Sequence, residues 1–454
     1  MARSDFVSAG CLPSGDERLP LALRERSTDM AELTGKPQRV VVVGQGYVGL
    51  PLAMRAVDVG YCVTGYDISE DRVKRLMAGE SYVEDVAHVQ LASALDSGRY
   101  QATSDAARCA GFDVAVITVP TPLREGNPDL SYIEKCSTVL GRFLRPGATV
   151  ILESTTYPGT TEELVGTLLE QASGLTAGVD FHLGYSPERI DPGNPVWQFE
   201  NTPKVVSGID EASLEAVQAF YDTLVEQTVA ASCTRVAELS KLLENTFRHV
   251  NIALVNELAM FARDLDIDIW EVVDAASTKP YGFTKFVPGP GVGGHCLPID
   301  PSYLSWRVKR SLGRNFRFVE LANDINDHMP DYVARRLMET LNERGKPLKG
   351  SRVLLLGLAY KKNTGDARES PATRVCALLL RYGAIVSAAD PLVMEAHVDA
   401  RVARVELTAE EVAMADVVVL LTDHDVFDLS LLASAQCVLD TRNCVPKAPS
   451  VQYL

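Results

Sequence analysis

The stretch RVVVVGQGYVGLPLAMRAVDVGYCVTGYDIS, residues 39–69, decides the fold of the first half of the chain. A run of valines leads into Gly44, Gly46 and Gly49, and an apolar-periodic segment and a second apolar run follow. This is the G-x-G-x-x-G pattern in a strand–turn–helix setting, which is typical of dinucleotide-binding units. In that setting Gly44 allows the turn, Gly46 lets the backbone approach a pyrophosphate, and Gly49 lets helix and strand pack closely.

The end of the same stretch indicates which dinucleotide binds. The pyrophosphate would lie at the helix N-terminus, where unpaired N–H groups and the helix dipole favour negative charge. Asp67 follows Gly46 by 21 residues and is expected to accept hydrogen bonds from the adenosine ribose. Because its carboxylate would repel a 2′-phosphate, the sequence favours NAD over NADP. Tyr47 and Val48, within the turn, are further predicted cofactor contacts.

Length, charge and cysteine usage exclude several classes of protein. A chain of 454 residues predicts two or three domains. The formal net charge of -16 argues against nucleic acid or an anionic membrane as a partner, and no apolar run approaches the ~18 residues of a membrane span. The nine cysteines form no C-x-x-C pair and no secretory signal is evident, so we expect reduced thiols and a cytoplasmic location.

Two further apolar runs end in polar loops. DVAVITVPTPL (113–123) and TVILESTTYPGTT (149–161) end in Thr, Ser and Pro, which suits the carboxyl edge of a parallel sheet, where ligands bind. Thr121 and Thr155 lie in these loops. Glu188, in the motif SPERIDPG, fits either a catalytic acid or a solvated side chain.

Two features occupy the middle of the chain. Residues 236–276 contain no Gly or Pro and keep apolar residues at helical spacing, so they predict one long helix that crosses between two domains and offers a subunit interface. Lys241 and Asn245 are four apart on it and share one face. Downstream, GPGVGGHCLPID (289–300) puts Cys296 behind four glycines, which fits either an inert buried cysteine or a loop that approaches a ligand.

A second unit of the same kind begins at Lys349. It reads as strand, loop, helix and strand, the last ending at Asp390, and DVVVLLTDH (416–424) and CVLDTRN (437–443) add strands. The pattern echoes the first unit without its full set of glycines. We therefore predict an α/β fold with two doubly wound Rossmann-like domains joined by a long central helix or helical domain.

At this point the motifs resemble a known family. VVGQGYVGLPLA, VPTPL, SPERIDPG, AELSKLLENTFRHVNIALVNE, PGPGVGGHCLPIDPSYL and KKNTGDARESP follow the order found in the UDP-glucose/GDP-mannose dehydrogenase family, from about residue 38 to 445. The resemblance implies NAD-dependent, four-electron oxidation of the C6 alcohol of a nucleotide sugar, with two NAD per sugar and an NDP-uronic acid as product. The alternatives are a two-electron 3-hydroxyacid dehydrogenase, which has no use for the Cys296 loop, and a non-catalytic nucleotide-sugar sensor, which would be expected to lose Cys296 or Lys241.

The resemblance also implies domain bounds and a substrate. We expect a mobile extension over 1–36, an NAD-binding domain over 37–235, a central helical and dimerisation domain with the cysteine loop over 236–330, and a nucleotide-sugar-binding domain over 331–454. The motifs GGHCxPxDPxYL and SPERIDPG look like the branch that acts on UDP-N-acetylhexosamines, with UDP-glucose and dTDP-glucose as alternatives. A homodimer or higher homo-oligomer through the central helix is expected.

Chemical roles follow from the implied reaction. The Cys296 thiolate would capture the intermediate aldehyde as a thiohemiacetal, whose oxidation leaves a thioester for water to hydrolyse. Lys241 and Asn245 would stabilise the oxyanions that form. Glu188 and Asp300 would activate water and handle protons, and Thr121 would order the water. His295 beside the cysteine makes a poor zinc site without further ligands, so no metal is expected.

The predicted binding residues complete the site. The cofactor contacts are Gly44, Gly46, Tyr47, Val48, Gly49, Asp67, Thr121, Thr155 and Arg368. The substrate contacts are Glu188, Arg189, Lys241, Asn245, Arg248, Phe283, Lys285, Gly293, Lys361 and Arg442, with Lys362 as a further candidate for a phosphate contact.

Overall fold

The computed structural model describes residues 38–124, 126–191, 194, 196–294, 297–393 and 399–454. Residue contacts divide the chain into two units, Met1–Lys241 and Leu242–Leu454, and each is described by itself. The predicted extension over 1–36 lies outside the described residues.

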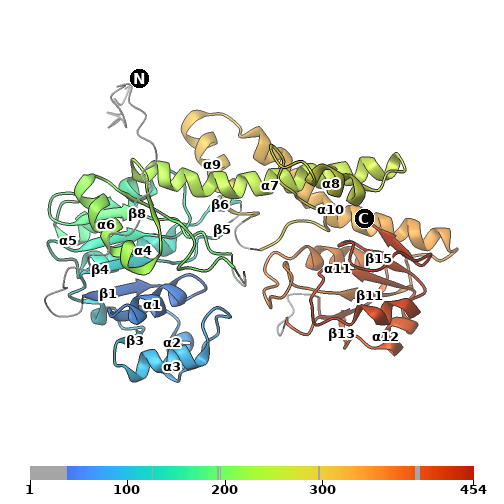
Figure 1. Ribbon diagram of the computed structural model, residues 1–454, viewed down its shortest axis with the longest axis horizontal. Coiled ribbons are helices and arrows are strands. Elements are labelled where there is room, and N and C mark those ends of the chain that lie inside the picture. Colours follow the sequence, from blue (N-terminus) through green and yellow to red (C-terminus); the bar gives the residue numbers. More distant parts are fainter. Residues whose placement is uncertain (1–37, 125, 192–193, 195, 295–296, 394–398) are drawn as a thin grey trace. The chain divides into compact units, whose positions relative to one another are not determined.

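The first unit contains an eight-stranded sheet in the order β10-β9-β8-β7-β4-β1-β2-β3. Figure 1 labels its strands β1, β3, β4 and β8. Its strands are β1 (Arg39–Val43), β2 (Cys62–Tyr66), β3 (Tyr100–Thr103), β4 (Val114–Ile117), β7 (Thr149–Leu152), β8 (His182–Tyr185), β9 (Lys204–Gly208) and β10 (Thr228–Ala230). All neighbouring strands pair in parallel except β8 and β9, which are antiparallel. The β4 and β7 strands are buried along their whole length, which explains their unbroken apolar sequences.

Helices complete the first unit and build its core. They are α1 (Gly49–Asp58), α2 (Glu70–Met77), α3 (His88–Asp96), η1 (Ala106–Cys109), α4 (Ser131–Gly141), η2 (Thr161–Gly166), α5 (Thr167–Ser173) and α6 (Glu211–Leu224), with a short hairpin of β5 (Leu123–Arg124) and β6 (Asn127–Pro128). The α1 side chains Leu50, Leu52 and Met54 are buried in one cluster with Val42 of β1. The strand order reverses beside β1, between β4 and β2, which is where doubly wound sheets bind ligands.

The long helix predicted over 236–276 is in fact two helices, α7 (Thr234–Asp264) and α8 (Ile269–Ser277). Asp266 adopts a left-handed conformation with φ +57°, and the Asp268 carboxylate caps α8 by accepting hydrogen bonds from the N–H groups of Trp270 and Glu271. The prediction of one helix was wrong because aspartates make this break, whereas the sequence was searched for Gly and Pro. Aspartate tolerates the left-handed region and is a strong N-cap residue.

The second unit contains a six-stranded, fully parallel sheet in the order β13-β12-β11-β14-β15-β16. Its strands are β11 (Arg352–Leu356), β12 (Ile385–Ala389), β13 (Ala403–Arg404), β14 (Val417–Leu420), β15 (Val438–Asp440) and β16 (Val451–Tyr453), and its further helices are α9 (Asp300–Leu312), α10 (Arg317–Glu343), α11 (Pro371–Arg381), α12 (Ala409–Met414) and η3 (Leu429–Ser434). Its strand order again reverses beside the first strand. The predicted fold class, two doubly wound α/β domains with a helical segment between them in the sequence, is confirmed. In the part of the chain described here, none of the helices has the length and apolar character that crossing a membrane requires.

Candidate functional site

The glycine turn after β1 is tight at two positions and open at the third. Gly44 has φ +91° and its N–H donates to the Tyr66 carbonyl at 2.7 Å. A Cβ added to Gly49 would lie 1.8 Å from the Gly44 carbonyl oxygen, so no side chain fits there. A Cβ on Gly46 would meet nothing within 4 Å, which leaves its backbone open to a ligand. No side chain caps α1 at Val48, and the N-terminal end of a helix favours an anion. The Leu50 N–H already donates to the Gly46 carbonyl at 3.1 Å.

Asp67 lies beside this turn. It follows β2 directly, and its carboxylate accepts hydrogen bonds from the N–H groups of Gln45 and Ser69, both at 2.9 Å. The Arg72 guanidinium lies 3.5 Å from one carboxylate oxygen. A carboxylate has about four acceptor positions, so Asp67 keeps capacity for a ribose hydroxyl. This geometry fits the adenosine half of NAD.

The other predicted residues of the cofactor loops lie at the same edge of the sheet. Thr121 is buried after β4, Thr155 is half-buried after β7, and Tyr47 is exposed in the glycine turn. Thr118, which sequence reasoning missed, also contributes. Its hydroxyl donates to the carbonyl oxygens of Val43 at 2.8 Å and Gly44 at 2.9 Å, which ties the end of β4 to the turn.

Three ionisable side chains, those of Glu153, Glu188 and Lys204, meet in the interior. Glu153 follows β7, Glu188 follows β8, and Lys204 begins β9. Lys204 Nζ forms ion pairs with Glu153 and, at 2.8 Å, with Glu188 Oε2. Tyr221 Oη donates to Glu153 Oε2 at 3.3 Å. Lys204 is 3% exposed and Glu153 is 1% exposed, so the group is a buried charge cluster.

The pKa values of the two glutamates in this cluster are shifted in opposite directions. Burial raises the pKa of Glu153 to about 8, against the opposing effect of Lys204. For Glu188, burial also raises the pKa, but the Lys204 ammonium and the hydrogen bonds to its carboxylate outweigh it and hold the pKa below its usual range. Glu188 is therefore a buried and ionised carboxylate, and the alternative of a solvated side chain is wrong. Sequence reasoning missed both Glu153 and Lys204.

Lys241 and Glu188 are brought together. The Lys241 ammonium, on α7, donates to the main-chain carbonyl of Glu188. The Glu188 carboxylate turns back to accept the N–H groups of Arg189 and Ile190, both at 2.6 Å. The Arg189 guanidinium donates to the Pro203 carbonyl at 2.8 Å.

In the second unit, Asn245 and Asp300 are also brought together. Asn245 Nδ2 donates to Asp300 Oδ2 at 2.6 Å, and both side chains are buried. Asp300 lies at the start of α9. Cys296 and His295 lie outside the described residues. Of this pair, Asp300 follows Cys296 by four residues in the sequence.

The glycine loop before Cys296 packs closely on the C-terminal domain. A Cβ added to Gly293 would lie 2.7 Å from the Glu369 carbonyl oxygen and 2.8 Å from Tyr360 Cβ. Gly294 has φ +83° and donates its N–H to the Arg368 carbonyl at 3.1 Å. Glycine is needed here because there is no room for a side chain.

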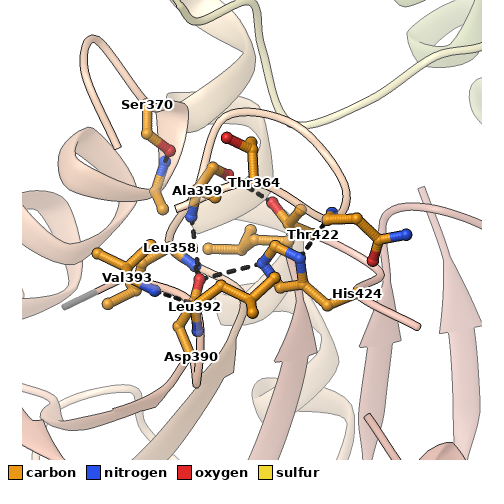
Figure 2. Close-up of polar contacts among 12 residues, drawn as sticks. Leu358, Ala359, Thr364, Ser370, Asp390, Leu392, Val393, Thr422 and His424 are labelled. Atoms are coloured by element: carbon orange, nitrogen blue, oxygen red, sulfur yellow. Dashed lines mark hydrogen bonds and ion pairs between the residues drawn. The ribbon is translucent and has the colours of Figure 1, made fainter. Parts of the chain in front are cut away.

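Asp390 occupies in the second sheet the place that Asp67 has in the first, directly after the second strand, but its surroundings differ (Figure 2). Its carboxylate accepts from the buried His424 Nε2 at 3.2 Å and from four backbone N–H groups, those of Leu358, Ala359, Leu392 and Val393. Although burial raises the pKa of Asp390, these hydrogen bonds bring it far below the usual range. His424 Nδ1 accepts the N–H of Asn363 at 2.9 Å, which fixes the loop that carries Lys361.

Three of the predicted basic contacts form ion pairs with acidic side chains. Arg368 pairs with Asp366, Lys285 with Asp274 at 2.6 Å, and Lys362 with Asp425 at 2.7 Å.

Arg442 Nε donates to the Leu421 carbonyl at 2.7 Å, and its Nη1 would lie 3.1 Å from a Cβ on Gly289. Lys361 is half-buried, and Arg248 and Phe283 are exposed. Within the described ranges, no group of three or more His, Cys, Asp or Glu side chains is arranged to hold a metal ion.

Comparison with known proteins identifies the family. Models of the UDP-glucose/GDP-mannose dehydrogenase family match residues 38–225 as the NAD binding domain, 235–328 as the central domain and 354–447 as the UDP binding domain. The chain is 34% identical over 418 residues to UDP-N-acetyl-D-mannosamine dehydrogenase from Pyrococcus horikoshii, covering 90% of this chain and 97% of that protein. It is 39% identical over 362 residues to UDP-N-acetyl-D-glucosamine 6-dehydrogenase from Pseudomonas aeruginosa, covering 79% and 84%. The solved structure of the Pyrococcus horikoshii enzyme superimposes with a TM-score of 0.83 at 33% identity, covering 92% of this chain and 99% of that one.

Proposed function

The chain belongs to the UDP-glucose/GDP-mannose dehydrogenase family and is an NAD-dependent nucleotide-sugar dehydrogenase, and we propose that it oxidises the C6 alcohol of a UDP-N-acetylhexosamine to a carboxylate. The observation that carries the choice of sugar is that relatives 34% and 39% identical are named for UDP-N-acetyl-D-mannosamine and UDP-N-acetyl-D-glucosamine. A UDP-glucose dehydrogenase from Pyrobaculum islandicum is also similar, at 30% identity and a TM-score of 0.82, so UDP-glucose and dTDP-glucose are the alternatives. The family membership sets aside a 3-hydroxyacid dehydrogenase and a non-catalytic sensor.

NAD supplies a hydride acceptor when it is bound beside the glycine turn. The open backbone at Gly46, the uncapped start of α1 and the carboxylate of Asp67 would hold its pyrophosphate and ribose. The overall reaction converts one alcohol, two NAD and one water into one carboxylate, two NADH and three protons. The protein must therefore hold an aldehyde-level intermediate between the two oxidations.

Cys296 is the proposed nucleophile for that intermediate. Its thiolate adds to the aldehyde, and after the second oxidation water hydrolyses the thioester and releases the thiol. Lys241 and Asn245 are the proposed donors to the oxyanion. The hydrogen bond from Asn245 to Asp300 supports this role, because it fixes the amide and leaves its second N–H free to donate. Glu188 is the proposed base for the hydrolytic water.

Product stoichiometry tests the proposed reaction. Purified protein is mixed with NAD and each of a panel of UDP-N-acetylhexosamines, UDP-glucose and dTDP-glucose, and NADH and sugar acid are counted. We expect two NADH per sugar and a uronic acid product. A ratio of one, with a free aldehyde or ketone, would contradict the four-electron reaction.

The covalent step is tested by intact-protein mass spectrometry. Glu188→Gln is expected to accumulate the mass of a bound sugar nucleotide, because it forms the thioester and hydrolyses it slowly. Cys296→Ala is expected to show no adduct. Carboxylate formation by Cys296→Ala at the wild-type rate would make the cysteine a structural residue.

We also propose that the chain forms a homodimer or higher homo-oligomer through α7, in the cytoplasm. Five apolar side chains of α7 are exposed, and their spacing puts them on one face of the helix: Leu243, Phe247, Leu254, Leu258 and Phe261. A contiguous exposed apolar face of this kind marks a protein contact. Six described cysteines have free thiols, which suits a reducing compartment: Cys62, Cys109, Cys136, Cys376, Cys437 and Cys444.

Light scattering after size exclusion tests the assembly. Phe261→Glu, which puts a charge on the apolar face of α7, is expected to give a monomer. Val179→Glu, at an exposed position of the first unit, is the matched control and is expected to leave the mass unchanged. An unchanged mass for Phe261→Glu would place the interface elsewhere.

A further inference from the structure

The buried charge cluster of Glu153, Lys204 and Glu188 exists because β9 runs antiparallel to its neighbour β8. The parallel strands β7 and β8 bring Glu153 and Glu188 to the carboxyl edge of the sheet. Because β9 is antiparallel to β8, its first residue, Lys204, lies at the same edge. A fully parallel sheet would put that lysine at the opposite edge.

Lys204 is held firmly in this position. Its ammonium lies between two carboxylates, and it also faces the rings of Phe199 and Tyr221, with Nζ 5.3 and 5.2 Å from the ring centroids. Cation–π contacts of this length contribute to holding an ammonium group where water is excluded. A buried charge with these partners has little freedom to move.

The Glu188 carboxylate is oriented by that lysine. One carboxylate oxygen accepts from Lys204, and the other accepts the N–H groups of Arg189 and Ile190. The side chain of Glu188 therefore bends back on its own following peptides. Fixing the carboxylate also fixes the peptide group of Glu188.

The carbonyl of that same residue receives the Lys241 ammonium. A continuous set of contacts thus runs from Glu153 to Lys204, then to the Glu188 carboxylate, and through the Glu188 backbone to Lys241. If Lys204 loses its charge, the buried Glu188 carboxylate loses its ion-pair partner and still lies beside Glu153. Such a carboxylate takes up a proton or turns away, and the carbonyl that holds Lys241 shifts with it.

We propose that Lys204, supported by Glu153, is a positioning residue that fixes the Lys241 ammonium through the side chain and carbonyl of Glu188. The inference rests on the proposed role of Lys241 as an oxyanion donor. It assigns no chemical step to Lys204. It explains why a lysine is buried 16 residues after Glu188 in a segment that carries no family motif.

Steady-state kinetics test the proposal, with the best nucleotide sugar of the panel as substrate. A displacement of about 1 Å in a catalytic group costs roughly 100-fold in rate, so Lys204→Met is expected to lower kcat by about that factor while KM for NAD stays unchanged. Lys204→Arg keeps the charge and is expected to restore most of kcat. Arg55→Met is the matched control, because Arg55 pairs with Glu200 and the Leu224 carbonyl outside the cluster, and it should leave kcat unchanged.

A double-mutant cycle separates positioning from general damage. If Lys204 acts through Lys241, adding Lys204→Met to Lys241→Met is expected to change kcat little further. Losses that multiply would overturn the proposal, because the two lysines would then act independently. If Lys204→Met does not fold, Lys204→Gln takes its place, since it keeps an N–H donor for Glu188 without the charge, and the same cycle decides.

A labelling experiment needs no turnover. Limiting acetic anhydride with peptide mass spectrometry measures the reactivity of the Lys241 amine against the exposed Lys349. In Lys204→Met, Lys241 is expected to react several-fold faster than in the wild type, because its acceptor has shifted. An unchanged ratio would overturn the inference. Failure of the wild type to oxidise any nucleotide sugar would instead overturn the proposed function. The labelling ratio of Lys241 could still be interpreted, because it does not depend on turnover.

Discussion

Replacing Gly46 and Gly49 separately by alanine would distinguish the two roles of the glycine turn, which are binding of the pyrophosphate and close packing of α1. Neither residue has a positive φ, so alanine fits the backbone at both positions and only the added methyl group matters. At Gly49 that group would lie 1.8 Å from the Gly44 carbonyl oxygen and 2.4 Å from Thr118 Oγ1. At Gly46 it would meet nothing within 4 Å.

The magnitudes follow from these contacts. Relieving the clash at Gly49 requires α1 to move away from β1 by more than 1 Å, and overpacking of this kind costs about 1–3 kcal/mol. At about 2–4 °C per kcal/mol for a domain of 150–250 residues, Gly49→Ala should lower Tm by roughly 2–12 °C. Gly46→Ala should leave Tm unchanged. Its methyl group would stand where the pyrophosphate approaches, and a loss of about 1.4 kcal/mol in binding already weakens NAD affinity tenfold.

The assay is thermal unfolding of both variants without ligand, followed by titration with NAD. Gly46→Ala is expected to unfold like the wild type and to bind NAD at least about tenfold more weakly, with KM for the nucleotide sugar unchanged. Gly49→Ala is expected to lose stability first. If Gly46→Ala bound NAD as tightly as the wild type, the turn would not be the pyrophosphate site, and the assignment of Asp67 to the ribose would fail with it.

Three further predictions concern charged and polar groups. Asp67→Ala is expected to raise kcat/KM for NADP relative to NAD, because it removes the repelling carboxylate and frees Arg72, 3.5 Å away, for a 2′-phosphate; an unchanged cofactor ratio would contradict this. His424→Leu leaves the Asp390 carboxylate without one donor, so it is expected to cost about 1–3 kcal/mol of stability. It is also expected to raise KM for the nucleotide sugar but not for NAD. His424→Gln can donate to Asp390 and accept from Asn363, so it should restore both the stability and the KM for the nucleotide sugar. Burial raises the pKa of Glu238 to about 7, which is above the pKa of the same group in the unfolded chain. The stability that this shift contributes is therefore present at low pH and is lost as pH rises through about 7. Urea unfolding at pH 5.5 and pH 8 should show this loss, and Glu238→Gln should flatten it.

The sequence predicted the parts of this protein that depend on near neighbours in the chain. The turn at Gly44–Gly49 and the acid at Asp67 lie within one strand–turn–helix–strand segment, and their spacing carries the geometry. Lys241 and Asn245 lie on one helix four residues apart, so helical periodicity alone put them on one face.

The parts that escaped prediction depend on pairings between distant segments. Glu153 and Lys204 are 51 residues apart and meet only because β9 is antiparallel to β8. The sequence signals a buried apolar run for such a strand but not its direction. An isolated lysine at a strand end, such as Lys204, suggests a solvated side chain. Its buried partners, Glu153 and Glu188, follow two other strands and cannot be recognised from the sequence around the lysine.

The break between α7 and α8 escaped prediction for a local reason. Asp266 and Asp268 end one helix and start the next through conformational and capping preferences that aspartate shares with many exposed positions. The two aspartates in the sequence are therefore only a weak indication of a helix break. The predicted extension and the cysteine itself lie outside the described residues, so their roles rest on the sequence and the family.

Asp390 bears on how many dinucleotides one chain can serve. Its carboxylate is fully engaged by His424 and four backbone N–H groups, so it has no acceptor left for an adenosine ribose of the kind that Asp67 can receive. Of these two aspartates in the described residues, Asp67 alone keeps an acceptor for the ribose, so we expect one NAD to bind at a time. For two successive oxidations, NADH then has to leave and a second NAD has to bind while the half-oxidised sugar stays bound. How long the sugar remains bound, relative to the rate of that exchange, would then decide whether a turnover reaches the acid.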